Sequence, residues 1–458
     1  MKRKIMCIIF VGMLLTVSFT AAAALKVNTE KKYNENDTET QPLDTSGVIR
    51  FKKRIIKPDS FQYGYSVQQT NDGGYIVVGE KKNPVFGTSN IWLLKFDKYG
   101  NIVTWENNIF GGDNIANSYS VQQTSDGGYI IAGCIYSSNA GSYDAYIIKT
   151  NSIGNLLVNG WSTEIDINSN SFDIAFSVKQ IYDGYIVTGV TGSEIEDGPG
   201  YNYETFLIKL NDYGNVVWKK TYPADYQSDN PEDKIWSDYR TTIQQTFDSD
   251  GTPDGFIFNS KDCLIGTDLQ GEVKYRLTYD IDRQCNSVQQ TKDGGFITGV
   301  GHYLVKYDND GDLDWKKEII SSFGVIRDVK QTFDSEGEPD GFIIAFDDQD
   351  CQLIKTNSDG EVLWTRSYTE RSDTTIPIFF YGESVQQTSD GGYVLTGGTF
   401  NDLDPGNYDG DNIDLYLIKT DSNGKYVLTK SKTMMTLFLM KIIQLFPELK
   451  LLLNNLLK

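Results

Sequence analysis

Short runs of alternating apolar and polar residues recur along most of the chain, and this alternation is typical of half-buried β-strands. The stretch SVQQTNDGGYIVVG, from Ser66 to Gly79, places two such runs on either side of a DGG sequence. Aspartate tolerates turn geometry and glycine supplies a positive φ, so Asp72, Gly73 and Gly74 predict a tight hairpin turn. Nearly the same stretch returns from Ser120, Ser287 and Ser384.

The first half of this stretch marks a repeat that runs through the chain. Copies of the VQQT element begin at seven positions: Val67, Val121, Val178, Ile243, Val288, Val329 and Val385. The first and last copies are 318 residues apart over six intervals, which gives a mean period of 53 residues. A repeat of this length indicates a propeller or a solenoid.

Each copy continues into a second pair of predicted strands. After the hairpin comes an apolar run such as IWLLKFD, and then a turn that ends in glycine. An alternating strand follows, with an aromatic residue four positions after that glycine, as at Trp218, Trp315 and Trp364. One unit therefore holds four short strands, which we name A to D in chain order, and no helical pattern. Seven such units predict an all-β, seven-bladed β-propeller of four-stranded antiparallel blades; a linear solenoid is the alternative.

The segment SGVIRFKK precedes the first copy but carries the pattern of a D strand, with Phe51 four residues after Gly47. In a ring this strand would complete the last blade and join the two ends, which also removes exposed sheet edges. The sequence therefore predicts a propeller over residues 47–430, closed by an N-terminal strand. We expect a monomer.

The two ends of the chain differ in composition from the repeats. Residues 1–24 carry a basic start, a short apolar run and small residues, which predicts a signal peptide and a secreted or cell-surface protein. Residues 25–46 are polar and predict a flexible leader. Residues 431–458 are rich in Leu, Ile and Met. They predict either an amphipathic helix on a membrane or on the ring, or a degenerate end of the coding region.

Composition narrows the classes of function. A net charge of −20 argues against nucleic acid as a partner and leaves only the C-terminal tail for membrane contact. His302 is the single histidine, so a Ser-His-Asp triad or a His-based zinc site would have to use it. The remaining cysteines are either disulfide partners of undetermined connectivity or buried thiols: Cys134, Cys263, Cys285 and Cys351.

Units such as SVQQTSDGGYIIAG from Ser120 and LIKTDSNG from Leu417 resemble the repeats of secreted bacterial and archaeal β-propeller proteins of uncharacterised function. The resemblance covers about residues 47–430 and implies a propeller and an exported location, without a particular activity. The glycine pair of DGGY gives a more distant likeness to kelch propellers, although the later Tyr and Trp spacing of kelch is missing. The tryptophan-rich signature of quinone-cofactor propellers is also missing.

The third residue of every A element is glutamine, whereas the second is glutamine in five units and lysine in two, Lys179 and Lys330. An amide both donates and accepts hydrogen bonds, so a residue present in every blade is expected to tie neighbouring blades together near the ring axis. A ligand-binding channel is the other interpretation. The seven glutamines of the structural repeat are Gln69, Gln123, Gln180, Gln245, Gln290, Gln331 and Gln387.

Two copies expand the A–B turn and gather carboxylates in glycine-containing loops. This pattern suits Ca²⁺, which takes oxygen ligands, although the spacing is not that of an EF-hand loop. A purely polar turn is the alternative. The candidate calcium ligands are Asp248, Asp250, Asp254, Asp334, Glu336 and Asp340.

Sequence variation concentrates in the B–C and D–A connections, which fall on one face of a propeller, and function often resides on such loops. Their aromatic and acidic residues suit a sugar, a cation or a basic peptide. The candidate ligand-binding residues are Tyr201, Tyr203, Tyr226, Trp236, Tyr239, Asp409, Asp411 and Asp414. The sequence therefore predicts an exported, non-catalytic scaffold that binds an extracellular protein or carbohydrate ligand. The alternative is an extracellular polysaccharide hydrolase or lyase that uses acidic residues, none of which is marked by a motif.

Overall fold

A computed structural model of the chain describes seventeen segments of the unit Thr38–Lys458: residues 38–40, 49–55, 62–82, 88–103, 109–137, 141–156, 159–169, 171–194, 201–228, 240–261, 263–278, 285–319, 324–348, 350–368, 370–371, 377–401 and 413–426. The predicted signal peptide and C-terminal tail lie outside these residues. None of the described residues forms a helix long and apolar enough to cross a lipid bilayer.

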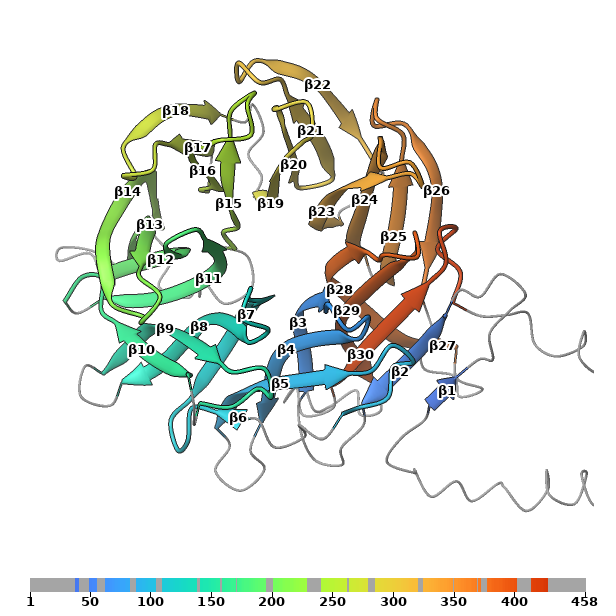
Figure 1. The fold of residues 1–458 in the computed structure, drawn as a ribbon, viewed down its shortest axis with the longest axis horizontal. Helices are drawn as coiled ribbons and strands as arrows, with labels where there is room; N and C mark the ends of the chain where they lie inside the picture. The colour runs from blue at the N-terminus through green and yellow to red at the C-terminus, as the bar shows by residue number, and fades with distance from the viewer. Residues whose placement is uncertain are drawn as a thin grey trace, which may run out of the picture. The chain divides into compact units, whose positions relative to one another are not determined.

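Seven antiparallel sheets surround a central space (Figure 1). The A strands are innermost and comprise β3 (Gln62–Gln69), β7 (Ala116–Gln123), β11 (Phe172–Ile181), β15 (Ile243–Phe247), β19 (Cys285–Gln290), β23 (Val325–Phe333) and β28 (Pro377–Gln387). The B strands are β4 (Tyr75–Lys82), β8 (Tyr129–Ser137), β12 (Gly184–Glu194), β16 (Pro253–Asn259), β20 (Phe296–Val300), β24 (Pro339–Asp348) and β29 (Tyr393–Asn401).

The outer half of each blade holds the C and D strands. The C strands are β5 (Ser89–Phe96), β9 (Ser142–Thr150), β13 (Tyr201–Leu210), β17 (Cys263–Thr267), β21 (Tyr303–Tyr307), β25 (Asp350–Thr356) and β30 (Ile413–Thr420). The D strands are β6 (Ile109–Phe110), β10 (Trp161–Ile165), β14 (Val216–Ser228), β18 (Val273–Thr278), β22 (Leu313–Glu318), β26 (Val362–Ser367) and β2 (Phe51–Ile55). The predicted all-β, seven-bladed propeller is therefore confirmed.

The ring is closed by β2, which pairs antiparallel with β30 from Phe51 opposite Lys419 to Ile55 opposite Leu415. The predicted closure by an N-terminal strand is thus confirmed. The guanidinium of Arg54 on β2 also binds the buried carboxylate of Asp414 on β30, with Nη2 and Oδ2 2.6 Å apart. A short strand lies at each edge of this sheet, β1 (Thr38–Thr40) and β27 (Glu370–Arg371). β1 falls within residues 25–46, which the sequence predicts to be a flexible leader. These three residues instead form a strand, because they pair with the outer edge of β2.

The DGG turn is held by a repeated set of contacts to one aspartate. In blade 1, Asp72 Oδ1 accepts hydrogen bonds from Thr70 Oγ1 at 2.5 Å, from the Gly74 amide at 2.9 Å and from Lys95 Nζ at 2.8 Å. Burial alone would raise the pKa of Asp72, but these donors outweigh burial and lower it to about 2. The lysine of each apolar LIKT-type run thus has a structural partner, as the pairs Lys149–Asp126, Lys306–Asp293 and Lys419–Asp390 also show.

A large apolar side chain of the D strand packs against the turn glycine of the next blade; in four blades it is the residue four positions after its own turn glycine, whereas Trp161 and Leu277 lie seven and six positions after theirs. A Cβ placed on Gly360 would lie 2.7 Å from the ring of Trp315, so only glycine fits this contact. Six blade junctions within the described residues share it: Phe51 with Gly100, Trp161 with Gly214, Trp218 with Gly271, Leu277 with Gly311, Trp315 with Gly360 and Trp364 with Gly424. The large side chain of the D strand and the turn glycine, which both recur in the repeat, therefore meet across a blade junction and not within one blade.

We expect Gly360→Ala to destabilise the fold more than Gly391→Ala. Both glycines have a positive φ, 78° and 77°, and alanine in this region costs about 1–2 kcal/mol. Nothing lies within 4 Å of a Cβ at Gly391, whereas a Cβ at Gly360 meets Trp315. Urea unfolding of both variants measures the difference, and equal losses of stability would show that the contact with the tryptophan has no energetic weight.

Candidate functional site

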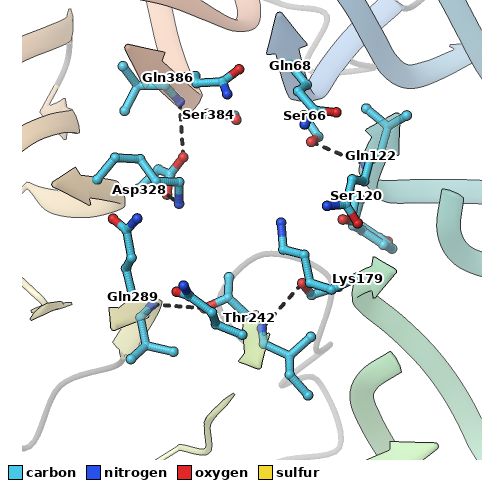
Figure 2. Close-up of a pocket in the computed structure, with 18 of the residues that line it drawn as sticks. Ser66, Gln68, Ser120, Gln122, Lys179, Thr242, Gln289, Asp328, Ser384 and Gln386 are labelled. Carbon is cyan, nitrogen blue, oxygen red and sulfur yellow. Dashed lines mark hydrogen bonds and ion pairs between the residues drawn. The ribbon is translucent and has the colours of Figure 1, made fainter. Parts of the chain in front are cut away.

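The seven A strands border an axial cavity of about 570 Å³ (Figure 2). Each A strand forms the inner edge of its sheet, apart from the start of β28, which pairs with β27, so the N–H groups on that edge have no partner strand. A buried N–H without an acceptor is costly, and the side chains of neighbouring blades supply the acceptors.

The serine of the SVQQT element provides the first set of acceptors. The Val121 amide donates to Ser66 Oγ of the preceding blade at 3.3 Å, and the Val288 amide donates to Thr242 Oγ1 at 2.9 Å. All seven junctions make this bond; the other acceptors are Ser120, Ser177, Ser287, Asp328 and Ser384. This position, a hydroxyl in six blades and the Asp328 carboxylate in the seventh, therefore joins every blade to the next.

The first glutamine of the element provides the second set. Its Oε1 accepts the amide N–H of the next blade's second glutamine, for example from Gln123 to Gln68 at 2.6 Å and from Gln331 to Gln289 at 2.7 Å. Five junctions have this bond, with Gln68, Gln122, Gln244, Gln289 and Gln386 as acceptors. Within the described residues, the two remaining junctions lack it because Lys179 and Lys330 occupy the position and an ammonium group cannot accept.

The second glutamine, which we predicted from the sequence to be a structural residue of the repeat, forms its side-chain hydrogen bond with the preceding blade instead of the next one. Six of the seven accept a turn amide of the preceding blade through Oε1 at 2.8–3.0 Å: Gln69, Gln123, Gln180, Gln290, Gln331 and Gln387. Several also donate through Nε2, as Gln290 does to the Phe247 carbonyl at 3.0 Å. Four of these side-chain amides therefore have both polar atoms engaged: Gln123, Gln180, Gln290 and Gln387.

The residue before the serine position does not repeat, and its variants gather at one end of the cavity. Blades 1 to 3 present Tyr65, Tyr119 and Phe176, whose neighbouring ring centroids are 5.2 and 4.7 Å apart. The guanidinium of Arg240, from blade 4, lies 5.3 Å from the Tyr65 ring centroid. Arg240 also pairs with Glu383 of blade 7. Blades 4 and 7 are three places apart, so this ion pair crosses the cavity instead of following a blade junction.

The carboxylate of Glu383, at the aromatic end of the cavity, is buried and held by several neighbouring side chains. Its Oε1 accepts a hydrogen bond from Tyr63 Oη at 2.5 Å, and its side chain is 3% exposed. Burial alone would raise the pKa of Glu383, but Arg240 and Arg327 outweigh burial and lower it below the ordinary range. Burial raises the pKa values of Tyr63 and Tyr65 well above the usual value, with Glu383 adding to the shift of Tyr63. This end of the cavity therefore holds an ionised carboxylate and neutral phenols.

The predicted ligand-binding residues do not form one described site. Tyr201, Tyr203 and Tyr226 lie in strands, in β13 and β14, and not in loops. Tyr203 is buried against Phe172 and Phe176, and Asp414 belongs to the closure pair with Arg54. Trp236, Tyr239, Asp409 and Asp411 lie outside the described residues.

The predicted calcium ligands are distributed over two turns that have their own internal bonds. Asp254 and Asp340 take the place of Asp72, because they accept from Thr246 and Thr332 and pair with Lys274 and Lys355. Asp248 and Asp334 accept the amides two and four residues later, those of Asp250 and Thr252 and of Glu336 and Glu338. The sequence did not single out Asp144, Asp166 and Asp173, whose carboxylate oxygens lie within 4.8 Å of one another.

The cavity residues that sequence reasoning missed are Tyr65, Tyr119, Arg240 and Glu383. Tyr65, Tyr119 and Glu383 could have been found from the sequence. The residue before each serine position varies between blades, whereas the residues that follow it are nearly constant. Arg240 had no such signal, because it follows a long connection and its partner is 143 residues away. Which side chains pair across the ring depends on the geometry of the closed ring, which no local sequence pattern indicates.

No protein-family model and no curated protein matches this chain. Among solved structures, streptogramin B lyase is similar with a TM-score of 0.46 and 12% identity, over 81% of this chain and 98% of that one. The extracellular domain of the putative one component system BT4673 from B. thetaiotaomicron has a TM-score of 0.43 and 11% identity, over 78% and 38% of the two chains. The Neurospora crassa Pan2 WD40 domain has a TM-score of 0.43 and 10% identity, over 79% and 91%. These neighbours are β-propeller proteins.

Proposed function

We propose that this protein is an exported, non-catalytic binding protein that holds a carbohydrate ligand in its axial cavity. The observation that carries the proposal is the cavity itself, whose volume of about 570 Å³ suits a small ligand or one end of a chain-like ligand. Its lining combines amides and charged groups, which hydrogen-bond hydroxyl groups, with aromatic side chains at Tyr65, Tyr119 and Phe176 that suit the apolar faces of sugar rings.

Binding is favoured over hydrolysis by the state of the carboxylates in the described lining. Hydrolysis of a glycoside requires one carboxylic acid that is protonated near neutral pH and a second carboxylate beside it. The lining carboxylates are Asp328 and Glu383. Glu383 has a lowered pKa and is held by Arg240 and Tyr63, whereas Asp328 accepts from Ser287 Oγ, Lys330 Nζ and the Val385 amide. Both groups are engaged as hydrogen-bond acceptors within the ring.

A glycan array probed with the purified full chain, with and without Ca²⁺, tests this proposal. We expect binding to a subset of glycans, with no release of reducing or unsaturated ends when the bound glycans are incubated with the protein. If binding depends on Ca²⁺, the expanded turns of blades 4 and 6, which hold the candidate calcium ligands, contribute to glycan binding. Failure to bind any glycan would overturn the proposal, and cleavage of a bound glycan would replace it with the hydrolase or lyase alternative.

A further inference from the structure

The first glutamine position differs from the second in what its polar atoms do. Each of its five glutamines uses Oε1 to accept a backbone amide of the next blade, which fixes the orientation of the side-chain amide. The Nε2 groups make no described hydrogen bond, although all five side chains line the cavity. Since the oxygens are committed to the blade junctions, the groups left for a ligand at this level are N–H donors.

The two lysines at this position add charge to the same level. Lys179 extends into the cavity in Figure 2, and no hydrogen bond or ion pair to its ammonium group occurs within the described residues. Lys330 lies on blade 6, on the other side of the ring, and its Nζ is 2.5 Å from Asp328 Oδ1. Around one level of the cavity there are therefore five amide donors and two ammonium groups, which we call the donor ring: Gln68, Gln122, Lys179, Gln244, Gln289, Lys330 and Gln386.

The charge of the cavity is opposite to that of the protein. The described lining contains four cations, Lys179, Arg240, Arg327 and Lys330, and two carboxylates, Asp328 and Glu383; Arg327 also pairs with the buried carboxylate of Asp347, which leaves a net of +1 in a chain whose net charge is −20. A positive, concave site in an acidic protein selects an anion from solution, and the surrounding low-dielectric walls strengthen the attraction.

Lysine is also the structurally inferior choice at this position. In five blades the glutamine supplies an acceptor to the next blade, and a lysine forfeits that bond for the amides of Gln245 and Gln387. Each of these lysines weakens one blade junction and places a positive charge in the cavity. Binding of an anionic ligand best explains why lysine occupies these two positions.

We propose that the donor ring binds the carboxylate or sulfate group of an acidic saccharide. This inference rests on the proposed carbohydrate-binding function and specifies the chemical class of the ligand. The ammonium groups of Lys179 and Lys330 supply charge-assisted hydrogen bonds to the anionic oxygens, and the glutamine amides supply neutral ones to the same group or to adjacent hydroxyls. Neutral saccharides lack the group that the two lysines recognise and are expected to bind more weakly.

The test uses variants that restore the residue found in the other blades. Lys179→Gln, Lys330→Gln and the double variant are compared with Lys98→Gln/Lys425→Gln, which changes the charge equally at two exposed lysines. Calorimetry measures binding of inorganic sulfate and of the acidic and neutral glycans retained on an array. We expect at least a tenfold loss of affinity for the acidic glycan in each cavity variant, and less than a twofold change in the surface variant.

Thermal unfolding provides the readout that separates a binding defect from a folding defect. Lys179→Gln supplies the missing acceptor for the Gln245 amide, so its melting temperature is expected to rise while anion binding falls. A lower melting temperature together with lost binding would instead indicate that Lys179 supports the fold, and would overturn the proposal.

The pH dependence of binding gives a further check on the same site. Burial, and then the charge of Lys330, lowers the pKa of Lys179 to about 8, while the carboxylate of Asp328 opposes this shift. The other charged groups of the lining are Arg240, Arg327 and Glu383. Binding of an anion requires the protonated ammonium, so affinity is expected to fall between pH 7 and pH 10, and to fall less in Lys179→Gln. An identical pH profile in the two proteins would overturn the role of Lys179.

The outcomes distinguish this inference from the function on which it rests. Binding of neutral glycans alone would overturn the acidic ligand and leave carbohydrate binding intact. Lysine-dependent binding of sulfate without binding of any glycan would overturn both the acidic saccharide and the proposed function, and would identify a site for a small free anion. No binding of sulfate or of any glycan would overturn both proposals.

Discussion

Replacing Glu383 with alanine is expected to lower the free energy of unfolding by about 3–5 kcal/mol, the cost of breaking a buried ion pair by removing one partner. The substitution leaves the Arg240 guanidinium in the cavity without its carboxylate and removes the hydrogen bond from Tyr63 Oη to Glu383. Because Glu383 joins blade 7 to blades 1 and 4, the loss affects the ring as a whole. Urea unfolding followed by tyrosine and tryptophan fluorescence measures the change.

The double variant Arg240→Ala/Glu383→Ala is the control. Removing both charges leaves no unpaired ion in the cavity, so the double variant is expected to be less destabilised than the sum of the two single variants. Additive losses would mean that the two side chains stabilise the ring independently.

The same carboxylate predicts how the stability depends on pH. The folded-state pKa of Glu383 is lowered, because Arg240, Arg327 and Tyr63 together outweigh the opposing effect of burial. A group with a lowered pKa stabilises the fold above its unfolded pKa, about 4.3 for glutamate, and this contribution is lost as the pH falls through the folded value. The difference in stability between the natural chain and Glu383→Gln is therefore expected to be present at pH 7 and to shrink below about pH 4.3.

Phe51→Ala is expected to cost about 3–5 kcal/mol and to release the closing strand. The Phe51 side chain is 1% exposed and packs on Tyr75, with ring centroids 5.7 Å apart, and on the Gly100 turn of blade 1. It belongs to one apolar cluster that includes residues from both the first and the last blades. Because β2 supplies the D strand of blade 7, loss of this packing weakens the junction that closes the ring.

Trp364→Ala provides the comparison, since Trp364 makes the same contact with Gly424 at the junction of blades 6 and 7. Its strand β26 follows the rest of blade 6 directly in the chain. Limited proteolysis with identification of the new N-termini is expected to show cleavage near residue 56 in Phe51→Ala but not in Trp364→Ala. Protection of β2 in both variants would show that its backbone pairing with β30 is sufficient for closure.

The architecture could be predicted from the sequence because each blade has its own local pattern of strands and turns. Alternation, the DGG turn and the turn glycine occur in nearly every repeat, and the count of repeats gives the count of blades. Even the closure was predictable, since Phe51 carries the D-strand pattern without a blade of its own. The candidate site was harder to predict. Tyr203 and Asp414 carry aromatic and acidic character suited to a ligand, but one is buried in the core and the other pairs with Arg54 in the closing strand.

The sequence by itself determined the strands, the turns, the number of blades and the two positions at which lysine replaces glutamine. These features follow from local periodicity and from the conformational preferences of glycine and aspartate, which act over a few residues. Only the tertiary structure decided which side chains meet between blades. It placed Trp315 on the glycine of the next blade, Arg240 against Glu383 across the axis, and the two glutamines of each element in different surroundings. The reason is geometric: closing the ring brings seven equivalent strands to one axis, where residues far apart in the chain share one cavity.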